Sequence, residues 1–411
     1  MRGVVWTFMT RLPKPAQHAS LVAFGMFLSV AGLELLLLFL PVTSGLRAQP
    51  VSDTNPVFRF TPDREFIHSK GWLLTDVNRG RVNNDGFVND SDYDALDSDP
   101  LLAVIGDSYV EALMVPFPKS LGGRLAMAAE DRHRVYTFAA SGAPLSQYLA
   151  YANYARQKFQ PRAMVVVVVG NDFDESLLEY KSAPGFNYFV MNDNGSLHIE
   201  HVDYQPSWLR GIVRRSSLAR YLLLNLDVLG TISRGVDEFV TWCADVATTT
   251  GDSPLFNASL FQRPQEIPTT DRRSRFVGNT RAEADAIRVL KSRQAVDAFL
   301  RMLPEWSGLP ASSTLFIVDG FRPQLYLPET LQGVHGSYFD RMRKYFIKEA
   351  GHLGYETLDL QIDFAYHYAT YGMRFETPQD NHWNALGHEV AATAVLGSEM
   401  FRRFLASGEF R

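Results

Sequence analysis

Short apolar segments recur along the chain beyond residue 100. They are Leu101 to Ile105, Val135 to Ala139, Met164 to Val169, Thr314 to Val318 and Glu356 to Leu360. Their length and composition are typical of β-strands. The segment Met164 to Val169 is apolar at every position, which indicates a central parallel strand covered on both faces.

The stretches between these segments carry apolar residues at intervals of three and four, as amphipathic helices do. We predict helices at Leu113 to Glu130, Ser146 to Phe159, Ala282 to Leu303, Ser337 to Ala350 and Ala385 to Phe404. Strands that alternate with helices predict an α/β fold with right-handed crossovers. We therefore expect a three-layer α/β/α sandwich around a mostly parallel five-stranded sheet.

The alternation stops between the third and fourth predicted strands. The interval Phe173 to Asn279 is too long for a simple loop. It contains a hairpin-like segment, Met191 to Val202, and two helix-like segments, Ser217 to Leu229 and Val236 to Val246. We predict that residues 173–279 are an insertion that caps the sheet beside the candidate active site.

The N-terminal region contains an apolar run from Ser20 to Val42 that is long enough to span a bilayer core. Three basic residues precede the run and only Arg47 follows it closely, which predicts a cytoplasmic N-terminus. A cleaved signal peptide and a buried core helix are the alternatives. The run is long for a signal peptide, and no clean small-x-small cleavage site appears.

A membrane span at this apolar run would divide the chain into two regions. Residues 1–50 would form a cytoplasmic N-terminus and a transmembrane anchor, and residues 51–411 an extracytoplasmic domain, periplasmic in a Gram-negative cell. The polar stretch Gln49 to Pro62 would be a short tether between them. Glu34 lies inside the apolar run, where it would be neutral, near the interface, or paired with another helix.

Composition narrows the possible functions. The chain has 46% hydrophobic, 12% aromatic and 21% charged residues, as globular proteins do. A net charge of −5 gives no basic field for nucleic acid, so no nucleic-acid partner is expected. Cys243 is the sole cysteine, which excludes an internal disulfide and a cysteine-based metal site.

The first candidate for chemistry is Gly106-Asp107-Ser108, directly after the first predicted strand. Ligands of open α/β sheets bind at the carboxyl ends of the strands. A serine at a helix start there has an exposed hydroxyl, and the nearby N–H groups can stabilise an oxyanion. The alternative is that these residues only form the turn and the N-cap.

Two further strand ends carry residues suited to an oxyanion hole. Gly142 follows the second predicted strand and Asn171 follows the third. A glycine N–H can approach a bound carbonyl oxygen closely, and an asparagine amide can supply another donor. Together with the Ser108 N–H they would bind the developing oxyanion, although glycine and asparagine also favour ordinary turns.

A general base is available near the C-terminus in the segment Asp380 to Asn384. The imidazole of His382 can accept the serine proton, and a carboxylate on its other nitrogen fixes the tautomer. Asp380 is the first candidate for that carboxylate, with Glu376 and Asp363 as alternatives. His388 lies six residues after His382, unlike the i, i+4 pair of metal sites, so we expect no metal and assign His388 to packing or capping.

These blocks, in this order, resemble those of the SGNH (GDSL-like) hydrolase superfamily, from about Asn83 to the C-terminus. The resemblance implies a flavodoxin-like fold and a catalytic triad with Ser108 as nucleophile, His382 as base and Asp380 as the residue that orients it. It also implies that Gly142, Asn171 and the Ser108 N–H form the oxyanion hole.

The chain departs from the commonest family pattern, which has the acid three residues before the histidine and a proline after it. Gln379 occupies the first of these positions and Trp383 the second. The Asp-x-His-Trp variant resembles that of bacterial members that add or remove acyl groups on envelope or secreted polysaccharides.

The resulting hypothesis is a serine esterase or O-acyltransferase that acts on acyl groups, expected to be acetyl, of a cell-envelope glycan or lipid. It requires no cofactor. A transmembrane acyl-donor protein is a further partner, suggested by Glu34 alone. The rival hypothesis is a non-catalytic accessory protein that keeps the fold and binds an envelope polymer or partner.

Overall fold

The computed structural model describes residues 14–130, 133–192, 194–206, 213–226, 276–327, 333–377 and 380–407, together with residues 211, 228 and 330. The chain divides into two compact units. The first comprises the described residues of Met1–Ser44, Ile67–Val77 and Ser207–Ser253. The second comprises those of Gly45–Phe66, Asn78–Pro206 and Pro254–Arg411.

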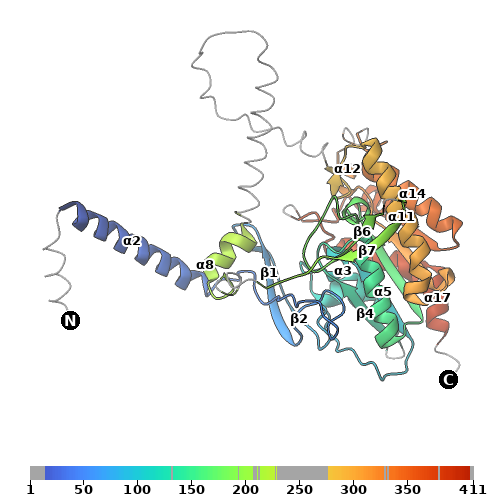
Figure 1. The fold of residues 1–411 in the computed structure, drawn as a ribbon, viewed down its shortest axis with the longest axis horizontal. Helices are drawn as coiled ribbons and strands as arrows, with labels where there is room; N and C mark the ends of the chain where they lie inside the picture. Colours follow the sequence, from blue (N-terminus) through green and yellow to red (C-terminus); the bar gives the residue numbers. More distant parts are fainter. Residues whose placement is uncertain are drawn as a thin grey trace, which may run out of the picture. The chain divides into compact units, whose positions relative to one another are not determined.

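A five-stranded parallel sheet forms the centre of the second unit (Figure 1). Its strands, in spatial order, are β11 (Glu356–Asp359), β10 (Thr314–Val318), β5 (Ala163–Val168), β3 (Leu101–Gly106) and β4 (Arg134–Ala139). Every neighbouring pair is parallel. All five predicted strands and the predicted α/β fold class are thus confirmed.

Helices bury both faces of this sheet, which makes three layers. One face is covered by α5 (Leu145–Phe159), α11 (Ala286–Ser307) and α14 (Tyr338–His352). The other is covered by α4 (Leu121–Ala129), α15 (Leu360–Tyr371), α16 (Ala385–Gly397) and α17 (Glu399–Ala406). Successive residues of a strand point to opposite faces of the sheet. Because helices cover both faces, the strand residues on both faces are apolar.

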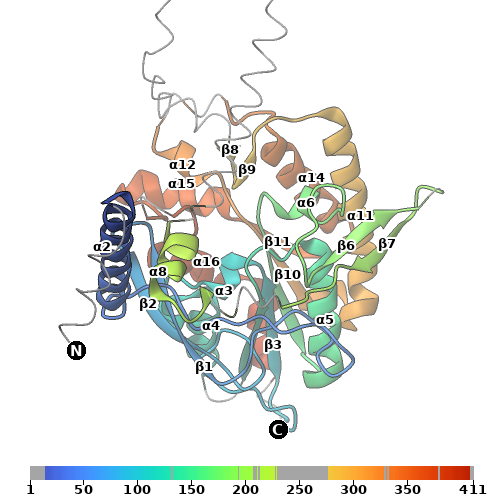
Figure 2. The ribbon, with the colours of Figure 1, turned by 60° about the vertical axis from the view of Figure 1, so that its left-hand side comes forward.

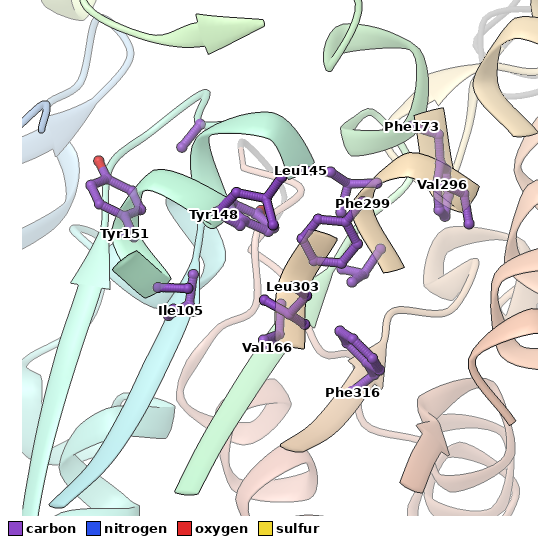
Figure 3. Close-up of a cluster of buried hydrophobic side chains, with 14 of the residues drawn as sticks. Ile105, Leu145, Tyr148, Tyr151, Val166, Phe173, Val296, Phe299, Leu303 and Phe316 are labelled. Atoms are coloured by element: carbon purple, nitrogen blue, oxygen red, sulfur yellow. The ribbon is translucent and has the colours of Figure 1, made fainter. Parts of the chain in front are cut away.

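The core beneath the first face is aromatic and closely packed. Ile105, Val166 and Phe316 project from three strands toward Tyr148 of α5 and Phe299 of α11, as Figure 3 shows. All five side chains are buried. The uninterrupted valines of β5 therefore reflect burial on both sides, as their pattern predicts.

The helix predicted over Leu113 to Glu130 is shorter than expected. Pro116 and Pro118 lack the N–H that a continuous helix needs, and Phe117–Lys119 forms an isolated 3₁₀ turn instead. The α-helix then begins at Leu121, where the Ser120 hydroxyl accepts a hydrogen bond from the N–H of Gly123.

The final predicted helix is divided into α16 and α17 at Ser398. The backbone of this residue is extended, with φ −70° and ψ 154°. Its hydroxyl accepts a hydrogen bond from the N–H of Phe401 and so caps α17. The apolar periodicity continues across the break, which is why one helix was predicted there.

The expectation of a polar tether at Gln49 to Pro62 is wrong. Val57 and Phe60 are buried among apolar residues of the second unit. Between them, the guanidinium of Arg59 lies 3.0 Å from the carboxylate of Asp85, which is also buried. The segment is therefore part of the second unit, because burial of its few apolar side chains outweighs its polar composition.

The described part of the interval 173–279 contains two hairpins. β6 (Asn187–Met191) pairs with β7 (Leu197–His201), which confirms the predicted hairpin, and β8 (Phe276–Val277) pairs with β9 (Thr280–Arg281). In place of the predicted helix Ser217 to Leu229 are a short α8 (Ser217–Arg220) and the π-helical turn η3 (Tyr221–Asn225). The predicted helix Val236 to Val246 lies outside the described residues.

The first unit is built around α2 (Lys14–Leu37). Within the described residues α2 is the one helix that is long and apolar enough to cross a membrane, and only 6% of its apolar window is buried. Helix α8 lies beside it (Figure 2). This unit also contains Ile67–Val77, which comprise the end of strand β1 (Arg64–Lys70), the connection after it and the start of its partner strand β2 (Thr75–Val82).

Candidate active site

Ser108 lies at the carboxyl end of the central strand β3. The strand ends at Gly106, and Ser108 is the first residue of the one-turn helix α3 (Ser108–Glu111). Asp107 between them accepts a hydrogen bond from the N–H of Tyr109 at 2.9 Å. A side chain at Gly106 would approach Val110 to 2.4 Å, so the tight turn between strand and helix requires glycine there.

The structure brings together the serine, the histidine and the aspartate that the sequence analysis singled out. The Nε2 atom of His382 lies 2.7 Å from the Oγ atom of Ser108. The Nδ1 atom of the same imidazole contacts Oδ1 of Asp380, which also accepts the backbone N–H of His382 at 3.0 Å. This is the arrangement in which an imidazole can accept a serine proton while a carboxylate holds its tautomer.

The two alternative acids have other surroundings. The carboxylate of Glu376 accepts a hydrogen bond from the hydroxyl of Tyr326 at 2.8 Å and lies 3.7 Å from Arg322. Asp363 is half-buried on helix α15. Of the three candidates, Asp380 is the one that contacts the imidazole.

A second carboxylate lies against the serine. The Oγ atom of Ser108 is 3.2 Å from Oδ2 of Asp107, whose side chain is buried. Burial raises the pKa of Asp107 to about 6, although the Tyr109 N–H and the nearby imidazole lower it.

Gly142 and Asn171, the two residues predicted for the oxyanion hole, are linked through an ion pair. Lys181 donates to the carbonyl oxygen of Gly142 at 2.9 Å and also pairs with Glu175. Glu175 in turn accepts a hydrogen bond from the Asn171 amide at 3.0 Å. An asparagine amide has two N–H donors, and this bond uses one of them. Gly142 itself has φ +82°, which favours glycine.

A row of asparagine amides connects this region to the histidine loop. Asn279, in the β8–β9 turn, donates to the side-chain oxygen of Asn171 at 3.2 Å. Its own oxygen accepts a hydrogen bond from Asn381, the neighbour of His382. The three amides therefore join the carboxyl end of the central strand β5, the small hairpin and the histidine loop.

Glu111 was not recognised in the sequence. Its carboxylate is buried and accepts hydrogen bonds from both the backbone N–H and the hydroxyl of Ser141, which precedes Gly142. Burial raises the pKa of Glu111 to about 7, and the bonds from Ser141 partly offset this. Glu111 thus holds the loop that presents the Gly142 N–H.

A buried ion pair that holds the histidine loop was also missed. The guanidinium of Arg322 pairs with Asp319 at 2.9 Å, just beyond the end of β10. Arg322 also donates to the hydroxyl of Tyr109 and to the carbonyl oxygen of Asn381. The indole N–H of Trp383 donates to Asp319 at 3.0 Å. Both neighbours of His382, Asn381 and Trp383, are therefore held in place by this ion pair. The sequence signal that could have indicated its role was the position of Asp319 at the end of a predicted strand.

His388 has a structural role at the start of α4. It is buried in the second apolar layer, and its Nδ1 atom accepts the N–H of Leu121 at the start of α4. Burial lowers its pKa to about 3, so the ring is neutral. Among the described residues no group of three or more histidine, cysteine or acidic side chains is placed to hold a metal ion.

No protein-family model and no curated protein matches the sequence. Among solved structures, the chain is similar to an alpha/beta hydrolase from the metagenome of Lake Arreo in Spain, with 12% identity, a TM-score of 0.35, and coverage of 74% of this chain and 95% of that one. A lipase/acylhydrolase from Enterococcus faecalis matches with 10% identity, a TM-score of 0.33, and coverage of 75% and 96%. An acetyl xylan esterase from Butyrivibrio proteoclasticus matches with 10% identity, a TM-score of 0.29, and coverage of 79% and 68%.

Proposed function

We propose that the chain is a membrane-anchored serine esterase or O-acyltransferase. Its substrates would be acyl esters, acetyl esters above all, of a cell-envelope glycan or lipid. The observation that carries the proposal is the 2.7 Å contact of Ser108 Oγ with His382 Nε2, with Asp380 on the opposite nitrogen. Ser108, His382 and Asp380 are assigned as nucleophile, general base and orienting acid.

The proposed reaction has two halves. Ser108 Oγ attacks the ester carbonyl carbon while His382 accepts its proton, and the tetrahedral oxyanion is bound by the N–H groups of Ser108 and Gly142 and the Asn171 amide. The C–O bond to the leaving alcohol breaks, and His382 returns the proton to that oxygen. Water or a sugar hydroxyl then attacks the acyl-serine, and its proton passes through His382 to Ser108.

The proposed location follows from α2. A bilayer-spanning α2, preceded by basic residues, would place the N-terminus in the cytoplasm and the second unit outside, periplasmic in a Gram-negative cell. Acylated polymers and lipids of the envelope are the esters available there. A transmembrane acyl-donor protein would be a partner only if the enzyme transfers acyl groups to an alcohol.

Fluorophosphonate labelling of the full chain in detergent micelles tests the proposal. The probe should label the wild type and Ser196→Ala, a serine exposed on the β6–β7 hairpin, but neither Ser108→Ala nor His382→Ala. Hydrolysis of p-nitrophenyl acetate should be lost in the same two variants. A folded wild type that neither reacts with the probe nor cleaves the ester would favour the non-catalytic accessory function.

A further inference from the structure

The first unit exposes large apolar side chains outside α2. Trp72 in the connection between β1 and β2 is 69% exposed, and Leu224 on η3 is 53% exposed. Phe39, just after α2, is 82% exposed. Leu38, Leu73 and Leu222, their neighbours in sequence, are also exposed. A concentration of such side chains in one unit indicates a surface that contacts something apolar.

The three segments that carry these side chains pack as one module. Leu37, Val42 and Leu74 form a small buried cluster against which Leu218 and Tyr221 pack. These five residues come from the last residue of α2, the segment after α2, the β1–β2 connection and α8–η3. The hydroxyl of Tyr221 also donates to the carbonyl oxygen of Trp72 at 2.9 Å, so the exposed side chains are carried on a connected frame.

Two polar side chains of this module, Glu34 and Asn225, are paired with groups of the same module. The Glu34 carboxylate accepts hydrogen bonds from the Ser216 hydroxyl and the backbone N–H groups of Ser217 and Leu218, at 2.6 to 2.9 Å. The buried amide of Asn225 donates to the hydroxyl and carbonyl oxygen of Ser69. Internal pairing of this kind is what a segment in contact with lipid requires.

The contacts of Glu34 also fix where α8 lies along the length of α2. Glu34 lies in the last turn of α2, which ends at Leu37, so α8 begins beside the end of that helix. Arg215 is exposed two residues before α8, in the same unit as the exposed leucines of η3. Apolar side chains beside a basic one are typical of segments that lie in the headgroup region of a membrane.

We propose that the β1–β2 connection, the residues after α2 and α8–η3 insert together into the interfacial layer of the phospholipid bilayer. Trp72, Phe39 and Leu224 would enter the boundary between headgroups and acyl chains, a depth that tryptophan favours. Arg215 would face anionic headgroups. The inference rests on the proposed membrane span of α2 and adds that the first unit also binds the lipid surface.

Site-directed fluorescence on the full chain tests this surface. In a Cys243→Ser background, single cysteines replace Trp72, Leu224, Val30 within α2, and Leu96. Leu96 is the matched control because it is apolar, 93% exposed and in the second unit. Each is labelled with an environment-sensitive dye and reconstituted in vesicles of phosphatidylethanolamine and phosphatidylglycerol, with and without lipids that carry a nitroxide on the acyl chain.

The expected result is a blue-shifted emission and quenching by the nitroxide lipid for labels at Val30, Trp72 and Leu224, and neither for the label at Leu96. Labels at Trp72 and Leu224 that behave like Leu96, with Val30 still quenched, would overturn the inference and leave the membrane span intact. A Val30 label in water would overturn both. Leu73 and Leu222 replace Trp72 and Leu224 if either variant loses fluorophosphonate reactivity.

Discussion

The guanidinium of Arg322 donates a hydrogen bond to the carbonyl oxygen of Asn381 at 3.0 Å, one residue before the candidate base His382. The hydroxyl of Tyr109 donates to the same oxygen at 3.1 Å and accepts from Arg322. Tyr109 is the residue after Ser108. The segments that carry the candidate nucleophile and base are therefore joined by a second, buried connection beside the Ser108–His382 contact.

Replacement of Arg322 by lysine should slow the reaction at Ser108. Lysine keeps the positive charge beside Asp319 but cannot reach Asp319, Tyr109 and Asn381 at once, so the imidazole is held less rigidly. We expect the second-order rate of fluorophosphonate labelling to fall by about tenfold or more. Arg374→Lys is the control, since that guanidinium stacks on Tyr326. An unchanged rate in folded Arg322→Lys would refute the positioning role.

Loss of the indole N–H of Trp383 should lower stability. Trp383→Phe keeps an aromatic ring but removes the hydrogen bond to the buried Asp319 carboxylate. A hydrogen bond to a charged group contributes about 1.5 to 3 kcal/mol, and the free energy of unfolding should fall by that amount in urea titrations. Trp306→Phe, at a half-buried tryptophan on α11, serves for comparison. Equal losses in both variants would mean that ring volume, not the hydrogen bond, is responsible.

Gly142→Ala should separate backbone strain from a role in the reaction. Gly142 has φ +82° and Gly195, in the β6–β7 hairpin, has φ +79°. A side chain in this backbone region costs about 1 to 2 kcal/mol, so both alanine variants should lose similar stability. Only Gly142→Ala should also reduce kcat/KM for p-nitrophenyl acetate, because its Cβ would lie 3.2 Å from Lys181 Nζ, beside the proposed oxyanion hole. Full activity of folded Gly142→Ala would exclude that assignment.

The buried carboxyl of Glu111 should make stability fall as pH rises. Its pKa is raised from an ordinary 4.5 to about 7, so the native protein holds the proton more tightly than the unfolded chain. The stabilisation is therefore complete below pH 4.5 and is lost as pH rises through about 7, at most about 3 kcal/mol. Glu111→Gln should lack this loss. Parallel pH profiles of unfolding free energy for the variant and the wild type would contradict the prediction.

The sheet and the candidate triad could be predicted because their signals are local. A parallel strand buried on both faces is apolar throughout, as at Met164 to Val169, and a strand end is where an exposed serine can react. The order of the blocks then linked Ser108 to His382.

The supporting contacts could not be predicted, because they depend on distant parts of the chain. Arg322 and Tyr109 are 213 residues apart, and nothing in either local sequence indicates the other. The segment Gln49 to Pro62 is a similar case, because the apolar side chains of Val57 and Phe60 acquire partners only in the folded unit. The division at Ser398 was missed for another reason, because apolar periodicity cannot report a break that preserves the buried face.

The contact between Ser108 and His382 spans 274 residues of sequence. Closing so long a loop is slow compared with forming the local helices and the neighbouring strands. During synthesis the candidate nucleophile Ser108 therefore emerges long before the candidate base His382, and their contact cannot form until the segment after α15 has been made and has docked on the sheet. An incompletely synthesised chain would carry an inert serine, so the order of the blocks delays reactivity until the fold is complete.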